Sequence, residues 1–258
     1  MQLKNKKILI TGAGSGIGRA IAIELSSYNN QLILCGRNLE KLNETQNLLK
    51  QQNAFCCAVD IQSSQDRQLL VQQVSDELGG LDVLINNAGV VHVGSLQEIS
   101  DHDIEQMMRT NLIAPIQLIR DFLPLLNQSK APALVNVGSM FGDIAYPLFS
   151  IYSATKFGLR GLSDALRREL SSQNIKVIYA APRATKTGAS SSFEKLIKPF
   201  GMALDTPEVV ARHIVTSIER GKTSIYPKTK EHFFLYVQRL FPKLVDQNVR
   251  KKIKNLKV

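Results

Sequence analysis

Apolar runs rich in aliphatic and β-branched residues alternate with longer stretches of helical periodicity from Lys7 to about residue 181. The runs lack a polar alternation, which is typical of strands buried on both faces of a parallel sheet. We therefore expect strands at residues 7–11, 31–35, 54–59, 82–86, 133–138 and 175–181. Helices are expected between them, at residues 16–27, 39–51 and 66–78. This order predicts an α/β fold with a doubly wound parallel sheet of the Rossmann type, because crossovers between parallel strands are right-handed.

The length of 258 residues and the hydrophobic content of 44% suit a single domain with a sizeable core. We expect this domain to span residues 1–228. Within it, residues 188–205 leave the strand pattern and carry apolar side chains at roughly helical spacing. Residues 229–258 combine aromatic and aliphatic side chains with many lysines, so we expect a basic amphipathic, helical C-terminal tail.

The net charge of +10 is concentrated at the C-terminal end of the chain. Residues 222–258 hold ten Lys or Arg and two Asp or Glu, whereas the preceding 221 residues are nearly neutral. An anionic membrane surface or a nucleic acid could attract such a tail. A solvated helix face and packing on the body are the alternatives. Packing is preferred because Pro227 and Pro242 interrupt the tail, and nucleic acid is disfavoured because no recognised binding module is present.

Several features exclude other classes of protein. No apolar run reaches 18 residues, so no transmembrane helix is expected. The N-terminal residues enter a strand at once, so we expect no signal peptide. The three cysteines have neither disulfide nor metal spacing, so we expect no metal site, reduced thiols and a cytoplasmic protein.

A glycine-rich turn, Thr11 to Gly18, follows the first strand and opens the first helix. Glycine lets the backbone approach a pyrophosphate closely, and the helix N-terminus offers N–H groups to that anion. The turn therefore predicts a dinucleotide site, although a glycine-rich turn without a ligand is the alternative. The candidate contacts in the turn are Gly12, Ser15, Gly16, Ile17 and Gly18.

The residue after the second strand discriminates between cofactors. An acidic residue there would bind a free ribose 2′-hydroxyl, but this chain has Arg37, which can pair with a 2′-phosphate. NADP(H) is therefore favoured over NAD(H). Arg19 could add to the same patch or be a solvated helix residue. Asp60 and Ile61, after the third strand, are placed to contact the adenine, and a turn cap is the alternative for Asp60.

A Tyr-x-x-x-Lys pair, Tyr152 and Lys156, follows Ser139 in the chain. On one helix the two side chains would lie a turn apart on the same face. A neighbouring ammonium lowers the pKa of a phenol from about 10, as general acid–base catalysis near neutrality requires. The pair alone is a weak signal, but beside a dinucleotide site it points to hydride transfer at a carbonyl or alcohol carbon.

The chain resembles the classical short-chain dehydrogenase/reductase family over roughly residues 4–190. The matching pieces are the glycine turn, Asp60, the run Asn86-Asn87-Ala88-Gly89, Asn111, Ser139 and the Tyr152/Lys156 pair. The resemblance implies a catalytic tetrad of Asn111, Ser139, Tyr152 and Lys156, with Tyr152 and Lys156 also touching the cofactor. It implies that Asn87, Ala88 and Gly89 line the cofactor, and that the protein forms homodimers or homotetramers.

One stretch departs from the family pattern. The family usually has Pro-Gly after the sixth strand, whereas this chain has Pro182 followed by Arg183. Thr187 keeps the family position that contacts the nicotinamide carboxamide, and the backbone of Thr185 could contact it too. For Arg183 we consider a substrate-site role and an exposed, solvated side chain equally.

These observations together predict an NADP(H)-dependent oxidoreductase acting on a carbonyl or secondary alcohol. Residues 188–205 would be a substrate lid whose apolar side chains favour a hydrophobic or acyl-type compound, unless they pack only on their own core. The main alternative is a non-catalytic NADP-binding redox sensor or scaffold, which would have no need of Tyr152. An epimerase or dehydratase on a related fold is disfavoured, because those proteins usually show different glycine spacing and a larger C-terminal domain.

Overall fold

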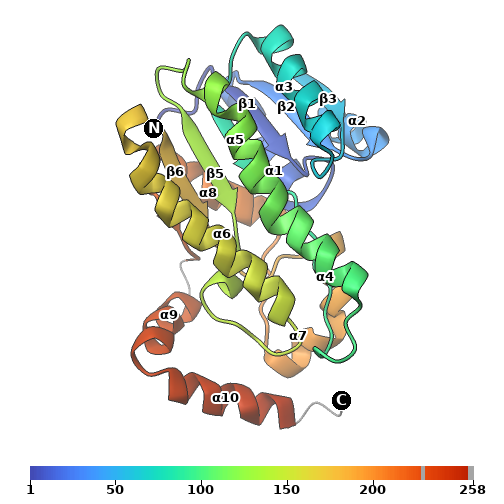
Figure 1. Ribbon diagram of the computed structural model, residues 1–258, viewed down its shortest axis with the longest axis vertical. Helices are drawn as coiled ribbons and strands as arrows, with labels where there is room; N and C mark the ends of the chain where they lie inside the picture. Colours follow the sequence, from blue (N-terminus) through green and yellow to red (C-terminus); the bar gives the residue numbers. More distant parts are fainter. Residues whose placement is uncertain (228–229, 255–258) are drawn as a thin grey trace.

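The computed structural model describes residues 1–227 and 230–254, and it contains one seven-stranded sheet. All strands are parallel, in the order β3-β2-β1-β4-β5-β6-β7 (Figure 1). The strands are β1 (Lys7–Thr11), β2 (Gln31–Gly36), β3 (Ala54–Ala58), β4 (Val83–Asn86), β5 (Ala133–Val137), β6 (Lys176–Ala180) and β7 (Ser224–Ile225). The predicted doubly wound Rossmann-type fold is confirmed.

Helices cover both faces of this sheet (Figure 1). The α-helices of the described residues are α1 (Gly16–Leu25), α2 (Leu39–Asn47), α3 (Ser64–Leu78), α4 (Asp101–Met108), α5 (Ala114–Leu126), α6 (Ser150–Glu169), α7 (Glu194–Phe200), α8 (Pro207–Glu219), α9 (Lys230–Leu240) and α10 (Pro242–Lys254). The apolar sides of α1, α2 and α8 pack on one face, and those of α3, α5 and α6 pack on the other.

Strand β1 illustrates why the strands of this sheet have continuous apolar runs in their sequences. Ile8 and Ile10 point into the core beneath α1 and α8, whereas Leu9 points into the core beneath α3 and α5. None of the three is exposed to solvent. A strand covered on both faces cannot keep a polar side, so its sequence loses the alternation of a half-exposed strand.

The structure differs from the expected elements mainly at their ends. Helix α2 stops at Asn47 and not at residue 51, and α1 ends at Leu25 before a short 3₁₀ turn. Strand β7, only two residues long, was not expected from the sequence. Its pairing with β6 adds the seventh strand at the edge of the sheet.

The segment expected to be a lid leaves the sheet after β6. It contains a 3₁₀ turn, Gly188–Phe193, followed by α7. Its two ends meet in an isolated bridge between Thr185 and Asp205. Asp205 also forms an ion pair with Arg183, with a guanidinium–carboxylate distance of 2.7 Å from Nε to Oδ2. The two ends of the segment are thus joined to each other.

The C-terminal tail is helical, as expected, and packs on the body. Helices α9 and α10 follow each other beyond the carboxyl ends of the strands and contact one another, and α10 lies next to α7 (Figure 1); we call this pair the α9–α10 hairpin. Leu235 on α9 and Val249 on α10 are buried. Within the described residues no helix is long and apolar enough to span a membrane. Contact of the tail with a membrane surface stays a prediction.

Gly18 offers a test of how tightly the glycine turn is built. A Cβ atom at Gly18 would overlap the carbonyl oxygen of Gly12, which is backbone and cannot move aside cheaply. We expect Gly18→Ala to lower the free energy of unfolding by about 1 to 3 kcal/mol through overpacking. Thermal and urea unfolding of the purified variant would measure this change.

Gly161 supplies the matched control, because it lies on the exposed side of α6 with no atom within 4 Å of its would-be Cβ. Gly161→Ala should stabilise the protein by about 0.5 to 1 kcal/mol, since alanine is the better helix former. Equal effects of the two substitutions would contradict the close packing at Gly18.

Candidate active site

The candidate site lies at the point where the strand order reverses between β1 and β4. Ligands of open α/β sheets bind at this position, outside the carboxyl ends of the strands. Here a cavity of about 1190 Å³ opens over the ends of β1, β2, β4, β5 and β6. It is larger than the roughly 300 to 1,000 Å³ of common ligand sites.

The structure brings most of the predicted site residues to this one cavity. Those that line it are Gly12, Ser15, Gly16, Ile17, Arg37, Asp60, Ile61, Asn87, Ala88, Gly89, Ser139, Tyr152, Lys156, Pro182, Thr185 and Thr187. Gly18 and Asn111 do not line it. Gly18 lies beneath the glycine turn, and Asn111 is fully buried behind the loop that follows β4.

The N-terminus of α1 faces the cavity with its backbone N–H groups uncapped by any side chain. Ser15 occupies the N-cap position without a side-chain hydrogen bond, and the first turn holds no acidic residue. In contrast, α2, α3, α4 and α8 are each capped by a side-chain oxygen. Free N–H groups and the positive end of the helix dipole suit an anion such as a pyrophosphate.

Strands β1 and β4 are tied together beside this turn. The hydroxyl of Thr11 accepts hydrogen bonds from the backbone N–H of Asn87 at 3.0 Å and of Ala88 at 3.1 Å. The side-chain amide of Asn87 donates to the Thr11 carbonyl at 3.0 Å. These bonds hold the loop after β4 close to the glycine turn after β1, so that both can contact one ligand.

The far end of the cavity, after β2, carries positive charge. Arg37 and Lys41 are exposed and line the cavity, and Asp60 is the one acidic residue among its described lining residues. Arg19 does not add to this patch. Its guanidinium is bound to Glu44 at 2.7 Å and to the carbonyl of Gly14 at 2.6 Å, so it braces the glycine turn.

Asp60 is a turn cap, and its predicted contact with the adenine stays a prediction. One carboxylate oxygen accepts a hydrogen bond from the backbone N–H of Gln62 at 3.0 Å, so the side chain caps a turn. The residue also lines the cavity together with Ile61.

Tyr152 and Lys156 lie one turn apart on α6, as their spacing predicts. The Lys156 Nζ is 5.6 Å from the centre of the Tyr152 ring and donates to the carbonyl of Val137 at 3.2 Å. Lys156 is only 4% exposed, and within the described residues no carboxylate pairs with it. Ser139, two residues after β5, lies beside the Tyr152 phenol.

The pKa values of this pair differ from the simple expectation of a lowered phenol pKa. Burial raises the pKa of Tyr152 to about 12, and its hydrogen bond with Ser139 opposes that rise. Burial also lowers the pKa of Lys156 to about 8. Because both groups are withdrawn from water, the cost of ionising either one outweighs the attraction between them in the protein alone.

Asn111 sits in a π-helical turn, Arg109–Ile113, between α4 and α5. Its side-chain oxygen accepts from the Val90 backbone N–H, and its amide donates to the Val90 carbonyl, both at 2.8 Å. A Cβ atom at Gly89 would lie 3.3 Å from the Asn111 Oδ1 and 3.7 Å from the Lys156 Nζ. The glycine thus keeps the path between these two polar groups open. Such π-helical turns are frequent at functional sites.

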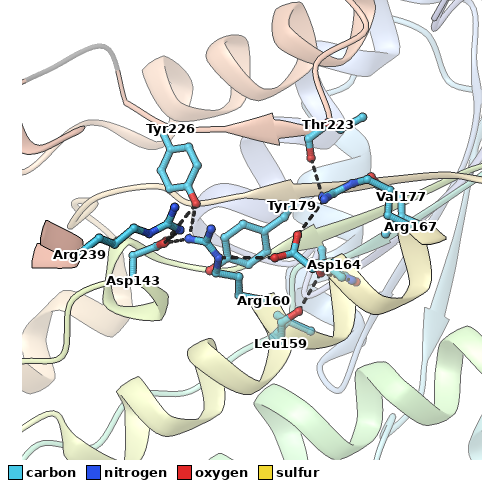
Figure 2. A network of polar contacts seen from close by, with 12 residues as sticks. Asp143, Leu159, Arg160, Asp164, Arg167, Val177, Tyr179, Thr223, Tyr226 and Arg239 are labelled. Carbon is cyan, nitrogen blue, oxygen red and sulfur yellow. Dashed lines mark hydrogen bonds and ion pairs between the residues drawn. The ribbon is translucent and has the colours of Figure 1, made fainter. Parts of the chain in front are cut away.

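The loop that carries Ser139 is supported from behind by a polar network. The Tyr179 hydroxyl donates to the Ser139 carbonyl at 3.1 Å, and Ser139 also caps the 3₁₀ turn Met140–Gly142. Figure 2 shows Arg160 between Asp143 and Tyr226, with Arg239 approaching Asp143 from α9. Arg160 follows Lys156 on α6 by one turn, so the network joins α6 to the Ser139 loop.

The segment after β6 closes the cavity from above. Thr187 lies next to the glycine turn, because a Cβ at Gly16 would be 3.0 Å from its methyl group. Arg183 is held in the ion pair with Asp205, at the base of the 188–205 segment. Arg183 also lines the cavity and is not a fully exposed side chain, so a substrate-site role for it stays a prediction.

The sequence pattern missed two groups of cavity residues. Lys41 lies in the first turn of α2, and its side-chain stem packs against Gly14. Its position in the turn that follows β2 was the sequence feature that could have indicated a role at the site. The tail helices α9 and α10 also line the cavity. Nothing in the sequence indicates that their apolar sides face this site.

Comparison with known proteins agrees with this geometry. The family model described as short chain dehydrogenase matches residues 6–196. The chain therefore belongs to the short-chain dehydrogenase/reductase family of oxidoreductases.

Relatives illustrate the range of this family. The ketoacyl reductase HetN of a Nostoc species is 30% identical over 225 residues, which cover 86% of this chain and 78% of HetN. A Burkholderia phymatum short-chain dehydrogenase/reductase solved with NAD has a TM-score of 0.87 at 22% identity, covering 95% of this chain and 96% of that one. A variant of actinorhodin polyketide ketoreductase solved with NADPH has a TM-score of 0.77 at 26% identity, covering 85% and 92%. A nicotinamide dinucleotide is therefore the cofactor type that the fold accepts.

The buried ammonium of Lys156 should cost stability at neutral pH. The pKa lowered from 10.5 to about 8 corresponds to about 3 kcal/mol. This penalty is complete below about pH 8, declines as the pH rises toward 10.5, and vanishes above it. We therefore compare the free energy of unfolding of Lys156→Met with that of the wild type at two pH values. The difference should favour the variant by up to about 3 kcal/mol more near pH 7 than near pH 11.

Urea unfolding of both proteins at the two pH values measures this change. Lys176→Met removes an exposed lysine on β6 and controls for the loss of one positive charge. A pH-independent difference between Lys156→Met and the wild type would show that the ammonium is not destabilised by burial.

Proposed function

We propose that this chain is an NADP(H)-dependent oxidoreductase that transfers a hydride between nicotinamide and a carbonyl or secondary alcohol carbon. The proposal rests on one observation: Tyr152, Ser139 and Lys156 face the same cavity as the uncapped N-terminus of α1. The substrate class we infer is hydrophobic or acyl-type. Aromatic side chains around the site support this class, and so do similar proteins named as ketoacyl and polyketide reductases.

The cavity supplies a set of contacts along the length of a dinucleotide. The glycine turn and the α1 N-terminus would hold the pyrophosphate, and Asp60 with Ile61 would hold the adenine. Asn87, Ala88 and Gly89 would line the ribose side. Contacts to the nicotinamide end would come from Pro182, Thr185 and Thr187. The bound cofactor supplies the hydride, and the protein supplies position and a proton.

Tyr152 would give its phenolic proton to the substrate oxygen during reduction. Its raised pKa keeps the phenol protonated near neutrality, so the acid form is ready before reaction. Ser139 lies beside this phenol and would polarise the same substrate oxygen.

Lys156 would bind the nicotinamide ribose and stabilise the phenolate that forms when Tyr152 loses its proton. A cation about one turn away attracts that negative charge. Asn111 would support a proton path toward Lys156, because the position beside Gly89 lies within reach of both side chains. An oxidised, positively charged nicotinamide would favour the phenolate further.

The preference for NADP(H) is supported by Arg37 and by Lys41, which lies beside it. Both cations line the end of the cavity that follows β2, where a carboxylate would favour the free ribose hydroxyl. A bidentate guanidinium and an ammonium together suit a 2′-phosphate.

We further infer a cytoplasmic homodimer or homotetramer. Ile113, Ile116 and Phe157 are large apolar residues exposed on the π-helical turn, α5 and α6. Pairing of two subunits through these helices would bury this exposed apolar area.

Replacement of the Tyr152 phenol tests the catalytic assignment. NADPH and NADH oxidation would be followed against a panel of ketones, aldehydes and 3-oxoacyl thioesters. We expect Tyr152→Phe to lower kcat by about 10² to 10⁴-fold, because the general acid is removed, while NADPH binding stays within about threefold.

Tyr236→Phe removes an exposed phenol on α9 and serves as the matched control. Full turnover by Tyr152→Phe would overturn the catalytic role of the phenol. Tight NADPH binding by the wild type without turnover of any substrate in the panel would favour a redox sensor or scaffold.

The cofactor preference has its own test. We expect Arg37→Gln and Lys41→Gln each to weaken NADPH binding by about 10- to 100-fold, since each removes one charge-assisted contact to the 2′-phosphate. NADH binding should change by less than about threefold. Lys50→Gln, at an exposed lysine after α2, is the charge-matched control, and calorimetric titration gives both dissociation constants. Equal weakening of NADH binding would show that the two cations contact a part of the cofactor other than the 2′-phosphate.

A further inference from the structure

The cavity does not end at the predicted lid but continues to the C-terminal helix hairpin. Seven residues of α9 and α10 line its distal end: Phe234, Val237, Leu244, Val245, Asn248, Val249 and Lys252. All but Asn248 and Lys252 are apolar. The same cavity is lined by Tyr152 and by the lid residues Phe193 and Phe200. One continuous space therefore joins the reacting groups to the tail.

The hairpin is anchored to the loop that carries Ser139. Leu235 on α9 is 5% exposed and packs with Met140 and Ile144, which follow Ser139 in the chain. Arg239 reaches Asp143 of the same loop, with a distance of 3.7 Å between the Arg239 Nη2 and the Asp143 Oδ1 (Figure 2). Asp143 is almost fully buried, so this contact ties α9 to an interior carboxylate.

A second anchor joins α10 to the lid. The Lys252 Nζ donates to the carbonyl of Phe200, the last residue of α7, at 2.8 Å. Lysine at the C-terminal end of a helix satisfies a carbonyl that lacks an intrahelical partner. The hairpin thus touches the two elements that frame the substrate side of the cavity, the Ser139 loop and the lid.

We propose that the α9–α10 hairpin is the distal wall of the substrate site and binds the apolar chain of the substrate. The proposal rests on the proposed function and extends it: the substrate is a carbonyl compound with a long alkyl or acyl chain. Its carbonyl would lie at Tyr152 and Ser139, and its chain would pass the lid aromatics to reach Val237 and Val245. The wall thereby determines chain-length specificity.

The cavity side of the hairpin is distinct from its outer side. Val237 and Val245 are partly buried and line the cavity, whereas Leu240 is 70% exposed and does not line it. Larger side chains at the two valines would shorten the cavity at its distal end. An equally large side chain at residue 240 would point to solvent and leave the cavity unchanged.

The test compares Val237→Trp and Val245→Phe with Leu240→Trp in the full-length protein. The substrates are methyl ketones or 3-oxoacyl thioesters of increasing chain length with NADPH. Wild-type kcat/KM should rise by up to about fourfold per methylene as the chain fills the apolar cavity, then level off. Each valine variant should lose about tenfold or more on the longest chains and stay within about twofold on the shortest. Leu240→Trp should match the wild type throughout.

Binding supplies a readout that does not need turnover. Calorimetric titration of a long-chain primary alcohol should show at least tenfold weaker binding to Val237→Trp than to the wild type or Leu240→Trp. Circular dichroism and thermal unfolding show whether Val237→Trp is folded. If it is misfolded, the same titration of Val245→Phe tests the proposal.

The outcomes separate this inference from the proposed function. Two outcomes would overturn the role of the hairpin in chain-length specificity: kcat/KM that does not depend on chain length, or equal losses on short and long substrates in the valine variants. Either outcome would leave the proposed oxidoreductase activity standing. No turnover of any carbonyl, together with alcohol binding that weakens in Val237→Trp, would overturn the proposed reaction but retain the apolar site.

Discussion

Lys156 places an ammonium group in the interior, where water cannot solvate it and no carboxylate among the described residues neutralises it. Such a charge must be held by its surroundings, since a buried cation is expensive. The carbonyl at the end of β5 accepts one of its hydrogen bonds, and Gly89 leaves open space beside it. Gly142 brings the Ser139 loop against the backbone of α6, as a Cβ there would lie 2.7 Å from the Lys156 carbonyl oxygen. The Lys156 ammonium therefore depends on β5, α6 and the Ser139 loop meeting at this point.

The central sheet could be predicted because its strands are buried on both faces. Every residue of β4 and β5 is buried, and all but Asn86 and Asn136 are apolar, so their sequences carry a strong apolar signal. Strand β7 gives no such signal, because two residues at the edge of a sheet are too few to form a pattern. The end of α2 was misplaced because Leu49, which is buried after the helix, continues its apolar spacing. Local periodicity does not distinguish a residue packed in a turn from one packed in a helix.

The candidate site could be predicted where its residues follow strands in sequence. Ser139 and Asn87 reach the same cavity because parallel strands end at the same edge of the sheet. The part that was missed depends on long-range packing. Arg183 finds its partner 22 residues away, in Asp205, and the tail reaches the cavity through α9. The pKa values of Tyr152 and Lys156 also depend on burial, which spacing within a helix cannot give.

The closed stem of the 188–205 segment has a consequence for any motion of this segment. Thr185 and Asp205 pair at its base, and two backbone hydrogen bonds, Lys186 to Asp205 at 2.8 Å and Asp205 to Ala184 at 3.0 Å, reinforce that pairing. Because the ends are already joined, the entropy of loop closure is not lost anew each time the segment moves. Opening is then a pivot of a preassembled flap about its stem, with little backbone to reorder, and closing over a ligand carries a small entropic cost.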